Sequence, residues 1–194
     1  PIQIVGIPRD KAPEPVLGNN PIILGERYYS PDFAKMEWEK MWTRVWQIAG
    51  RVDQIPEPGD YVSYEIMHES IICIRGEDNR IRAFYNACQH RGNQLVTAEA
   101  GTLASGEFQC AYHGWRFSDT GECTWAYDDD DFPQGTPCGK LKLSEIPCEI
   151  WAGFIWFNMD PKTKPLRDWL EPVASHLDTY QMEEMKRTHW VTIE

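Results

Sequence analysis

The segment "NACQHRGNQLVTAEAGTLASGEFQCAYHGWRF", residues 86–117, carries two short motifs that each combine one thiol with one imidazole. Cys88 and His90 are separated by one residue and Cys110 and His113 by two, with nineteen residues between the motifs. Structural zinc sites commonly place two cysteines in one loop and two histidines in the other. Here each loop supplies one ligand of each kind, which predicts a metal centre built from two facing loops.

The alternation of thiol and imidazole indicates the kind of centre. If the two loops face each other, the cysteines can bind one metal and the histidines a second metal beside it. This is the ligand division of a Rieske [2Fe–2S] centre, with two Cys on one iron and two His on the other. Neutral imidazoles in place of thiolates make the cluster less negative, so it accepts an electron more readily than a Cys₄ cluster. A mononuclear zinc site with the same four ligands is the alternative.

Residues next to the motifs fit a cluster-binding role. Gly92 and Gly114 closely follow the two histidines, where close approach of the backbone is predicted to let N–H groups face bridging sulfides. The aromatic side chains of Tyr112 and Trp115 are expected to shield the cluster from water. The four other cysteines have no metal-like spacing, and we interpret them as structural thiols of a reducing compartment: Cys73, Cys123, Cys138 and Cys148.

The composition of the 194 residues restricts the class of protein. Hydrophobic residues make up 42% of the sequence, so the chain can bury a sizeable core. The 19 basic and 30 acidic residues give a net charge of −11, which argues against a nucleic-acid partner. No segment has the roughly 18–20 apolar residues of a membrane span. The N-terminus lacks the features of a signal peptide, so we expect no membrane partner and a cytoplasmic location.

The pattern along the chain predicts a mainly β protein flanked by a helix at each end. A Ser-Pro-Asp start at 30–32, followed by apolar residues every three or four positions, predicts an amphipathic helix that ends near Trp46. Residues 165–180 return to a helical pattern, and "RTHWVTIE" at 187–194 resembles the start of a strand. Between the helices, short runs predict an antiparallel β-sandwich or barrel with strands at 60–66, 70–75, 80–87, 107–110, 115–125 (a hairpin about 119–121) and 149–158 (with Gly153 at a turn or bulge). The acidic run at 128–131 is expected to form a solvated loop.

The motifs "CQHRG" (88–92) and "CAYHGW" (110–115) resemble the Rieske domain of ring-hydroxylating oxygenase α subunits, the Rieske non-haem iron oxygenases. The similarity also covers "WQIAGRVDQIPEPGDY" and "EIWAGFIWFNMDP", and so nearly the whole chain. The resemblance implies that Cys88 and Cys110 ligate the buried iron, and that His90 and His113 ligate the outer iron. It also implies a Rieske-type fold with a cluster-binding subdomain, divided into an N-terminal arm and helix (1–46), a Rieske domain (47–158) and a connector (159–194).

The resemblance further implies an activity and partners. Electrons would come from a reductase or a ferredoxin and pass to a mononuclear non-haem iron, where O₂ is activated to hydroxylate an organic, aromatic substrate. Family α subunits form trimers, in which the cluster of one subunit supplies the mononuclear iron of its neighbour.

The residues that would hold the second iron are not recognisable in this sequence. The family holds that iron with two His and one carboxylate in a catalytic domain beyond the Rieske domain. His68, His176 and His189 do not show the clustered spacing of such a site, and we interpret them as ordinary surface or core residues. We therefore expect the mononuclear iron in a catalytic domain outside this sequence, which would make the chain a fragment or a truncated product.

Three alternatives to an oxygenase subunit can be weighed. Respiratory and photosynthetic Rieske proteins carry an extra cysteine in each loop, where this sequence has Asn93 and Tyr112, so that class is disfavoured. A freestanding Rieske-type ferredoxin shares the ligand pattern but lacks the N-terminal helix and the "PLRDWLEPV" segment at 165–173. A zinc-stabilised binding module predicts a colourless protein without labile sulfide.

Overall fold

The computed structural model describes residues 25–103, 105–189 and 191. The chain forms two compact units, Pro1–Lys40 and Met41–Glu194. In the described part of the first unit, a 3₁₀ turn, η2 (Gly25–Tyr28), precedes the helix α1 (Pro31–Glu37). The Ser30 side chain accepts a hydrogen bond from the backbone N–H of Phe33 at 3.3 Å, which caps the helix as the Ser-Pro-Asp start predicted.

The predicted end of this helix near Trp46 is wrong. Regular α-helix ends at Glu37 and is followed by one π-helical segment, η3 (Trp38–Trp42). The side-chain amide of Gln47 donates to the carbonyl of Trp42 at 2.8 Å, which satisfies a backbone acceptor where the helix ends. Trp46 is buried and its indole N–H donates to the carbonyl of Lys164 at 3.1 Å. The apolar period that suggested more helix therefore includes a residue of the β core.

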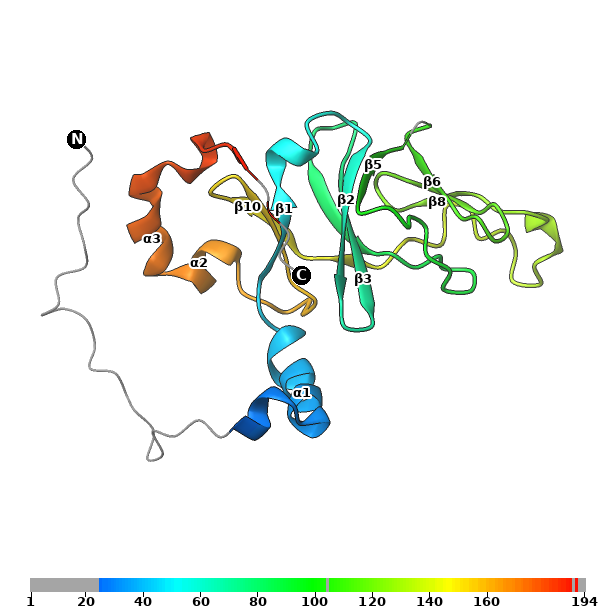
Figure 1. Cartoon of the computed structure of the whole chain (residues 1–194). Coiled ribbons are helices and arrows are strands. Elements are labelled where there is room, and N and C mark those ends of the chain that lie inside the picture. The colour runs from blue at the N-terminus through cyan, green and yellow to red at the C-terminus, as the bar shows by residue number, and fades with distance from the viewer. Residues whose placement is uncertain (1–24, 104, 190, 192–194) are drawn as a thin grey trace, which may run out of the picture. The chain divides into compact units, whose positions relative to one another are not determined.

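The described residues of the second unit form three antiparallel sheets (Figure 1). Sheet A has the order β1-β11-β10, with bounds Gln47–Arg51, Phe154–Phe157 and Cys148–Trp151. Sheet B has the order β5-β2-β3-β4-β9, with bounds Ala100–Thr102, Asp60–Ile66, Glu69–Arg75, Ile81–Tyr85 and Glu145–Ile146. Sheet C has the order β6-β7-β8, with bounds Glu107–Gln109, Arg116–Ser118 and Cys123–Trp125. This mainly β architecture confirms the predicted fold class.

Strand β3 lies at the centre of the unit and is buried on both faces. Successive side chains of a strand point to opposite faces. On one face Cys73 contacts Cys148 of sheet A. On the other face Ile72 and Ile74 belong to the core that includes Phe108 and Phe117 of sheet C. The continuous apolar run "IICI" thus joins sheet A to the part of the molecule that carries the cysteine and histidine motifs.

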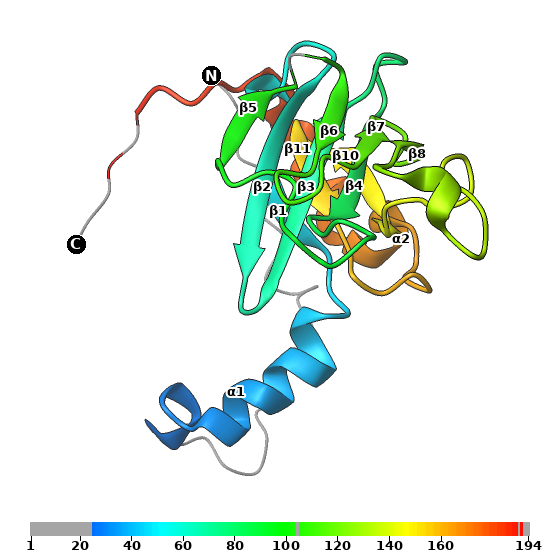
Figure 2. The same cartoon turned by 90° about the vertical axis from the view of Figure 1, so that its right-hand side faces the viewer.

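Sheet C holds the second motif between β6 and β7, beside the five-stranded sheet (Figure 2). The predicted hairpin about 119–121 is confirmed: Gly121 has φ +82°, and its N–H donates to the backbone carbonyl of Ser118 at 2.9 Å. Asp119 accepts a hydrogen bond from the backbone N–H of Glu77 at 2.8 Å, which anchors this hairpin to the β3–β4 turn. A two-residue turn at Ala152 and Gly153, with φ +55° and +77°, connects β10 to β11, as the sequence predicted.

The C-terminal helical segment is interrupted. It comprises α2 (Leu166–Leu170), α3 (Val173–Leu177) and two 3₁₀ turns, η6 (Asp178–Tyr180) and η7 (Met182–Glu184). Pro172 has no N–H to continue the first helix, so the single predicted C-terminal helix is split. Residues 187–189 have no regular structure, and most of the strand predicted at 187–194 lies outside the described residues.

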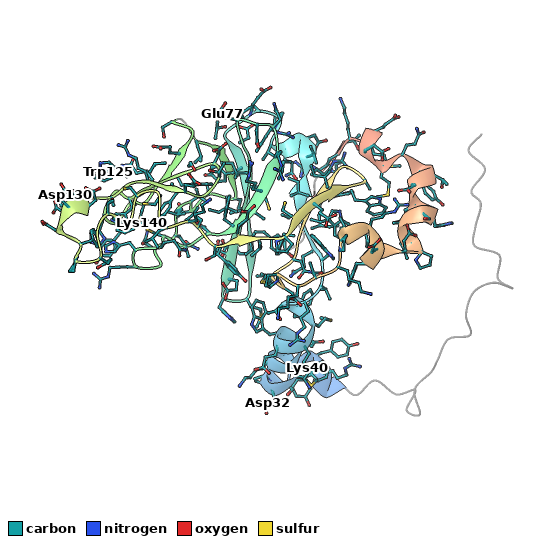
Figure 3. The ribbon with its side chains drawn as sticks, turned by 180° about the vertical axis from the view of Figure 1, so that it is seen from behind. Asp32, Lys40, Glu77, Trp125, Asp130 and Lys140 are labelled. Atoms are coloured by element: carbon teal, nitrogen blue, oxygen red, sulfur yellow. The ribbon has the colours of Figure 1, made fainter. Side chains whose placement is uncertain are left out.

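Short 3₁₀ turns complete the second unit at η4 (Val52–Gln54) and η5 (Asp129–Asp131). The acidic run forms η5, which has no buried residue, in agreement with a solvated loop. Trp125, Asp130 and Lys140 lie at the same end of the unit, beyond sheet B (Figure 3). Among the described residues, no helix combines the length and the apolar character needed to cross a membrane.

Candidate metal centre

The structure brings all four predicted ligands together. The first loop follows β4 and carries Cys88 and His90, and the second connects β6 to β7 and carries Cys110 and His113. The two thiols contact each other. The two imidazole rings lie with their centroids 4.7 Å apart and their planes at 63°. Each residue therefore lies beside its counterpart of the same type from the opposite loop, thiol beside thiol and imidazole beside imidazole.

The two loops repeat one backbone arrangement. In each, the cysteine N–H donates to the carbonyl of the fifth following residue, and the N–H of the fourth, a glycine, donates back to the cysteine carbonyl. These bonds are 2.9 and 2.8 Å in the loop of Cys88, and 2.8 and 2.9 Å in the loop of Cys110. Gly92 and Gly114 have φ of +73° and +72°, in the left-handed region that favours glycine. A glycine four positions after each cysteine was the sequence signal for this repeat, which motif spacing alone did not reveal.

The backbone N–H groups of the first loop have two kinds of acceptor. The N–H groups of Gly92 and Gly114 close the loops by donating to cysteine carbonyls. The backbone N–H groups of His90 and Arg91 instead donate toward the sulfur of Cys88. The loop therefore offers backbone donors to a thiolate at Cys88, and the predicted donors to bridging sulfides stay a prediction.

Burial distinguishes the cysteine side of the centre from the histidine side. Cys88 and Cys110 are each 3% exposed, whereas His90 and His113 are half-buried. Burial raises the pKa of the Cys88 thiol, and the Cys110 thiol raises it further, against the effect of the backbone N–H donors. Burial lowers the pKa of His90, and the nearby His113 and Arg91 lower it further. The neutral imidazole favoured in this way is the form that binds metals.

The two aromatic residues of the second motif differ in exposure. Trp115 is 3% exposed and stacks on the ring of His90, as expected of a residue that excludes water. Tyr112 is 56% exposed, and its shielding role stays a prediction. Its ring lies 3.8 Å from that of His113, centroid to centroid, and the guanidinium of Arg91 lies over it at 5.8 Å. Tyr112 thus forms part of the surface around the histidines.

The residues present fit a group that binds between the loops. Nδ1 of His113 is buried and has no hydrogen-bond partner, and a bound metal ion would give this nitrogen a partner. In the part of the chain that the structure describes, no three or more His, Cys, Asp or Glu side chains converge to hold a single ion. A centre with two irons and two protein ligands for each does not require such a group. The donor set, two thiols and two imidazoles in like pairs, matches that division.

Asn86 is a residue of the site that the sequence did not reveal. It is 3% exposed, and its Oδ1 accepts hydrogen bonds from the N–H groups of Leu95 and Val96 at 2.9 and 3.1 Å. Its Nδ2 donates to the carbonyl of Val96 at 2.7 Å and to Oγ of Ser70 at 2.9 Å. Asn86 thereby closes the first loop at its base and attaches it to β3. A polar residue directly after a strand and two positions before the cysteine was the available signal.

The other candidate residues lie elsewhere. His68 and His189 are exposed and His176 is half-buried on α3, in agreement with ordinary surface or core positions. All six cysteines are free thiols. Cys73 and Cys148 contact each other between sheets A and B, and Cys123 contacts Cys138 next to the core of the site.

Comparison with known proteins identifies the domain. Residues 45–137, which include both loops, match the family described as the Rieske [2Fe-2S] domain. The chain contains a Rieske [2Fe–2S] domain. The cofactor of a Rieske domain is the [2Fe–2S] cluster, in keeping with the paired ligands described above.

Relatives of this Rieske domain are subunits of oxygenases. The chain is 29% identical over 173 residues to the methanesulfonate monooxygenase hydroxylase subunit alpha of Methylosulfonomonas methylovora, covering 84% of this chain and 42% of that protein. It is 35% identical over 144 residues to the large oxygenase component of the naphthalene 1,2-dioxygenase system of Pseudomonas putida, covering 73% and 32%. The crystal structure of a quaternary ammonium Rieske monooxygenase matches with a TM-score of 0.73 at 29% identity, covering 79% of this chain and 44% of that one. The chain thus spans less than half of the length of these relatives.

Proposed function

We propose that Cys88, His90, Cys110 and His113 ligate a [2Fe–2S] cluster, and that the chain is the electron-transfer part of a Rieske oxygenase α subunit. The observation that carries the proposal is the pairing of thiol with thiol and imidazole with imidazole across two loops of one backbone design, inside a matched Rieske domain. The N-terminal arm and helix would comprise residues 1–46, the Rieske domain 47–158 and the connector 159–194.

The buried cysteines and the half-buried histidines would have different roles in holding the cluster. Cys88 and Cys110 would hold the inner iron in the core, and His90 and His113 the outer iron at the surface. When bound, the cluster takes up and releases one electron at a time. The backbone N–H groups that donate toward the sulfur of Cys88 would stabilise its thiolate. The lowered pKa of His90 favours the neutral imidazole, which is the form that binds a metal. Partners would exchange electrons at the half-buried histidine edge, because the cysteine edge lies under the core.

The relatives support a proposal for the activity of the parent enzyme. We propose a reductase or a ferredoxin as the electron donor, a mononuclear non-haem iron held by a catalytic domain as the acceptor, and an α-subunit trimer as the assembly. The parent enzyme would use O₂ to hydroxylate an organic substrate. The names of the relatives include methanesulfonate monooxygenase, carnitine monooxygenase and naphthalene dioxygenase, so the aromatic class of substrate stays a prediction.

Metal and sulfide analysis combined with EPR tests the cluster. We expect iron and labile sulfide in equal amounts, two of each per chain, and an EPR signal of the dithionite-reduced protein with the low average g-value of mixed His and Cys ligation. A colourless protein with one zinc per chain and no labile sulfide would overturn the proposal.

Substitution of the histidines tests the ligand assignment. Rieske centres lie at roughly −150 to +300 mV and Cys₄ clusters of plant-type ferredoxins at about −400 mV. His113→Cys and His90→Cys are therefore expected to lower the reduction potential or to abolish the cluster. The control is His68→Cys, on the exposed turn between β2 and β3, which should leave both unchanged. If all three variants keep the spectrum of the wild type, the ligand assignment is wrong.

A further inference from the structure

Asn93 and Trp115 occupy equivalent positions in the two loops, the fifth residue after the cysteine, and both side chains reach the opposite loop. Trp115 stacks on His90 of the first loop. Nδ2 of Asn93 lies 3.9 Å from Sγ of Cys110 in the second loop, in a partly buried hydrogen bond. The two crossing contacts thus reach one imidazole and one thiol of the proposed ligand set.

The orientation of the Asn93 amide is fixed by its neighbours. Its Nδ2 also donates to the carbonyl of Gln94 at 2.8 Å, and a carbonyl can only accept. The nitrogen therefore faces the protein, with its second N–H available for the sulfur. The backbone carbonyl of Asn93 accepts the N–H of Cys88 at 2.9 Å, so the residue is held by both its main chain and its side chain.

A donor at this sulfur has a chemical consequence. A thiolate that ligates iron carries negative charge, and a hydrogen bond to it is stronger than one to a neutral thiol. The reduced cluster is more negative than the oxidised cluster, so the bond stabilises the reduced form more and raises the potential. Cys110 is 3% exposed, which limits the access of water as a substitute donor.

We infer that Asn93 is a positioning residue that raises the reduction potential of the cluster by donating an N–H to Sγ of Cys110. This inference rests on the proposed ligand assignment. It concerns the side chain alone, because the backbone bonds that shape the loop are shared by both loops whatever residue stands at the fifth position.

Redox titration of the intact protein tests the inference. Asn93→Leu keeps the approximate shape without a donor, and Asn93→Asp replaces the donor with a negative charge. For Asn93→Leu we expect the ratio of reduced to oxidised cluster at a fixed ambient potential to fall about tenfold, which corresponds to a shift of about 59 mV for a one-electron couple. Asn93→Asp should shift further in the same direction. Gln94→Leu, at the neighbouring exposed position, is the matched control and should leave the potential unchanged.

A second measurement detects the bond itself. In resonance Raman spectra, an Fe–S(Cys) band of the wild type should shift between H₂O and D₂O, and this shift should be lost in Asn93→Leu. An unchanged potential in a fully loaded Asn93→Leu protein would overturn the inference, as would loss of the cluster from both Asn93 variants, which would indicate a role in assembly. Absence of a two-iron cluster from the wild type would instead overturn the proposed function, and iron and sulfide analysis of that protein separates the two failures.

Discussion

The rings of His90 and Trp115 stack almost parallel, with their centroids 4.8 Å apart and their planes at 5°. The two residues come from different loops, so the contact fixes one loop against the other. Trp115 also meets the ring of Phe132 edge to face at 5.8 Å. One buried indole therefore links the imidazole edge of the site to the core beneath it.

We expect Trp115→Ala to destabilise the protein by about 3–5 kcal/mol, because it removes a buried aromatic side chain and leaves a cavity. The substitution should also reduce cluster content, since His90 loses the surface that orients its ring. Trp115→Phe should retain more of both. Denaturation in urea and the visible absorbance of the cluster measure the two effects. Trp125→Ala is the control, because Trp125 is 43% exposed and its loss should cost far less. Equal effects of both alanine variants would contradict the role of the stack.

Asn86 provides a test of the base of the first loop. Asn86→Leu leaves the N–H groups of Leu95 and Val96 without their acceptor, and we expect a loss of roughly 3 kcal/mol or more in the free energy of unfolding. Ser70→Ala removes one of the four side-chain hydrogen bonds of Asn86, together with the exposed bond from Ser70 to Glu65, and should cost about 1 kcal/mol. Chemical denaturation of the two variants gives the comparison. A loss no greater in Asn86→Leu than in Ser70→Ala would show that the loop is held by other contacts.

The two loop glycines make a matched pair. Both adopt positive φ, so Gly92→Ala and Gly114→Ala each place an L side chain in a conformation that costs about 1–2 kcal/mol. A Cβ at Gly92 would meet no atom within 4 Å, whereas one at Gly114 would lie 3.2 Å from the ring of Trp125. We expect the alanine at Gly114 to be the more destabilising. Combining it with Trp125→Ala should remove that excess, which a double-mutant cycle of unfolding free energies detects as non-additivity.

The carboxylate of Asp60 predicts a pH-dependent contribution to stability. The Thr102 hydroxyl donates to it at 2.6 Å and lowers its pKa, and the backbone N–H of Glu57 at 2.9 Å and the charge of Arg75 lower it further, against the effect of burial. Since the pKa in the folded state lies below the ordinary value of 3.8, the stabilisation is complete above that value and is lost as the pH falls below it.

Thr102→Val should therefore destabilise the protein at pH 7 by less than about 1 kcal/mol, because the hydrogen bond lies at the surface. The difference from the wild type should shrink as the pH falls below 3.8 and Asp60 of the wild type becomes protonated. Urea denaturation at pH 7 and pH 3 measures it. A difference that is the same at both pH values would indicate that the threonine acts through packing.

The parts of the fold that could be predicted are those with strong local signals. Alternation and turn residues predicted the strand at 60–66 and the hairpins at 119–121 and 152–153. The strands β5 and β9, with three and two residues, are too short to show a period and form by pairing with sheet B. The end of the N-terminal helix was misplaced because Trp46 fits the helical period, although its indole belongs to the β core. The spacing of apolar residues shows that a side chain is buried, but not whether it packs on the face of the helix or among the β-strands.

In the site, too, the features with a local sequence signal could be predicted and those that depend on long-range contacts could not. Four side chains with a specific chemistry and spacing were sufficient to predict that Cys88, His90, Cys110 and His113 come together. The contacts that hold them depend on long-range geometry. Asn86 acts through residues nine and ten positions away, and Asn93 through a sulfur seventeen positions away, so neither forms a local motif. The exposure of Tyr112 likewise depends on how the second loop lies on the core.

The duplicated loop has a consequence for how the site can change. The main-chain bonds around Cys88 and Cys110 are the same, yet the imidazole stands two residues after one cysteine and three after the other. The same main-chain arrangement therefore carries its histidine at either the second or the third position after the cysteine. The residue types at these positions, and not the backbone, decide which metal ligands a loop offers. The main-chain bonds of each loop therefore do not depend on where its imidazole stands.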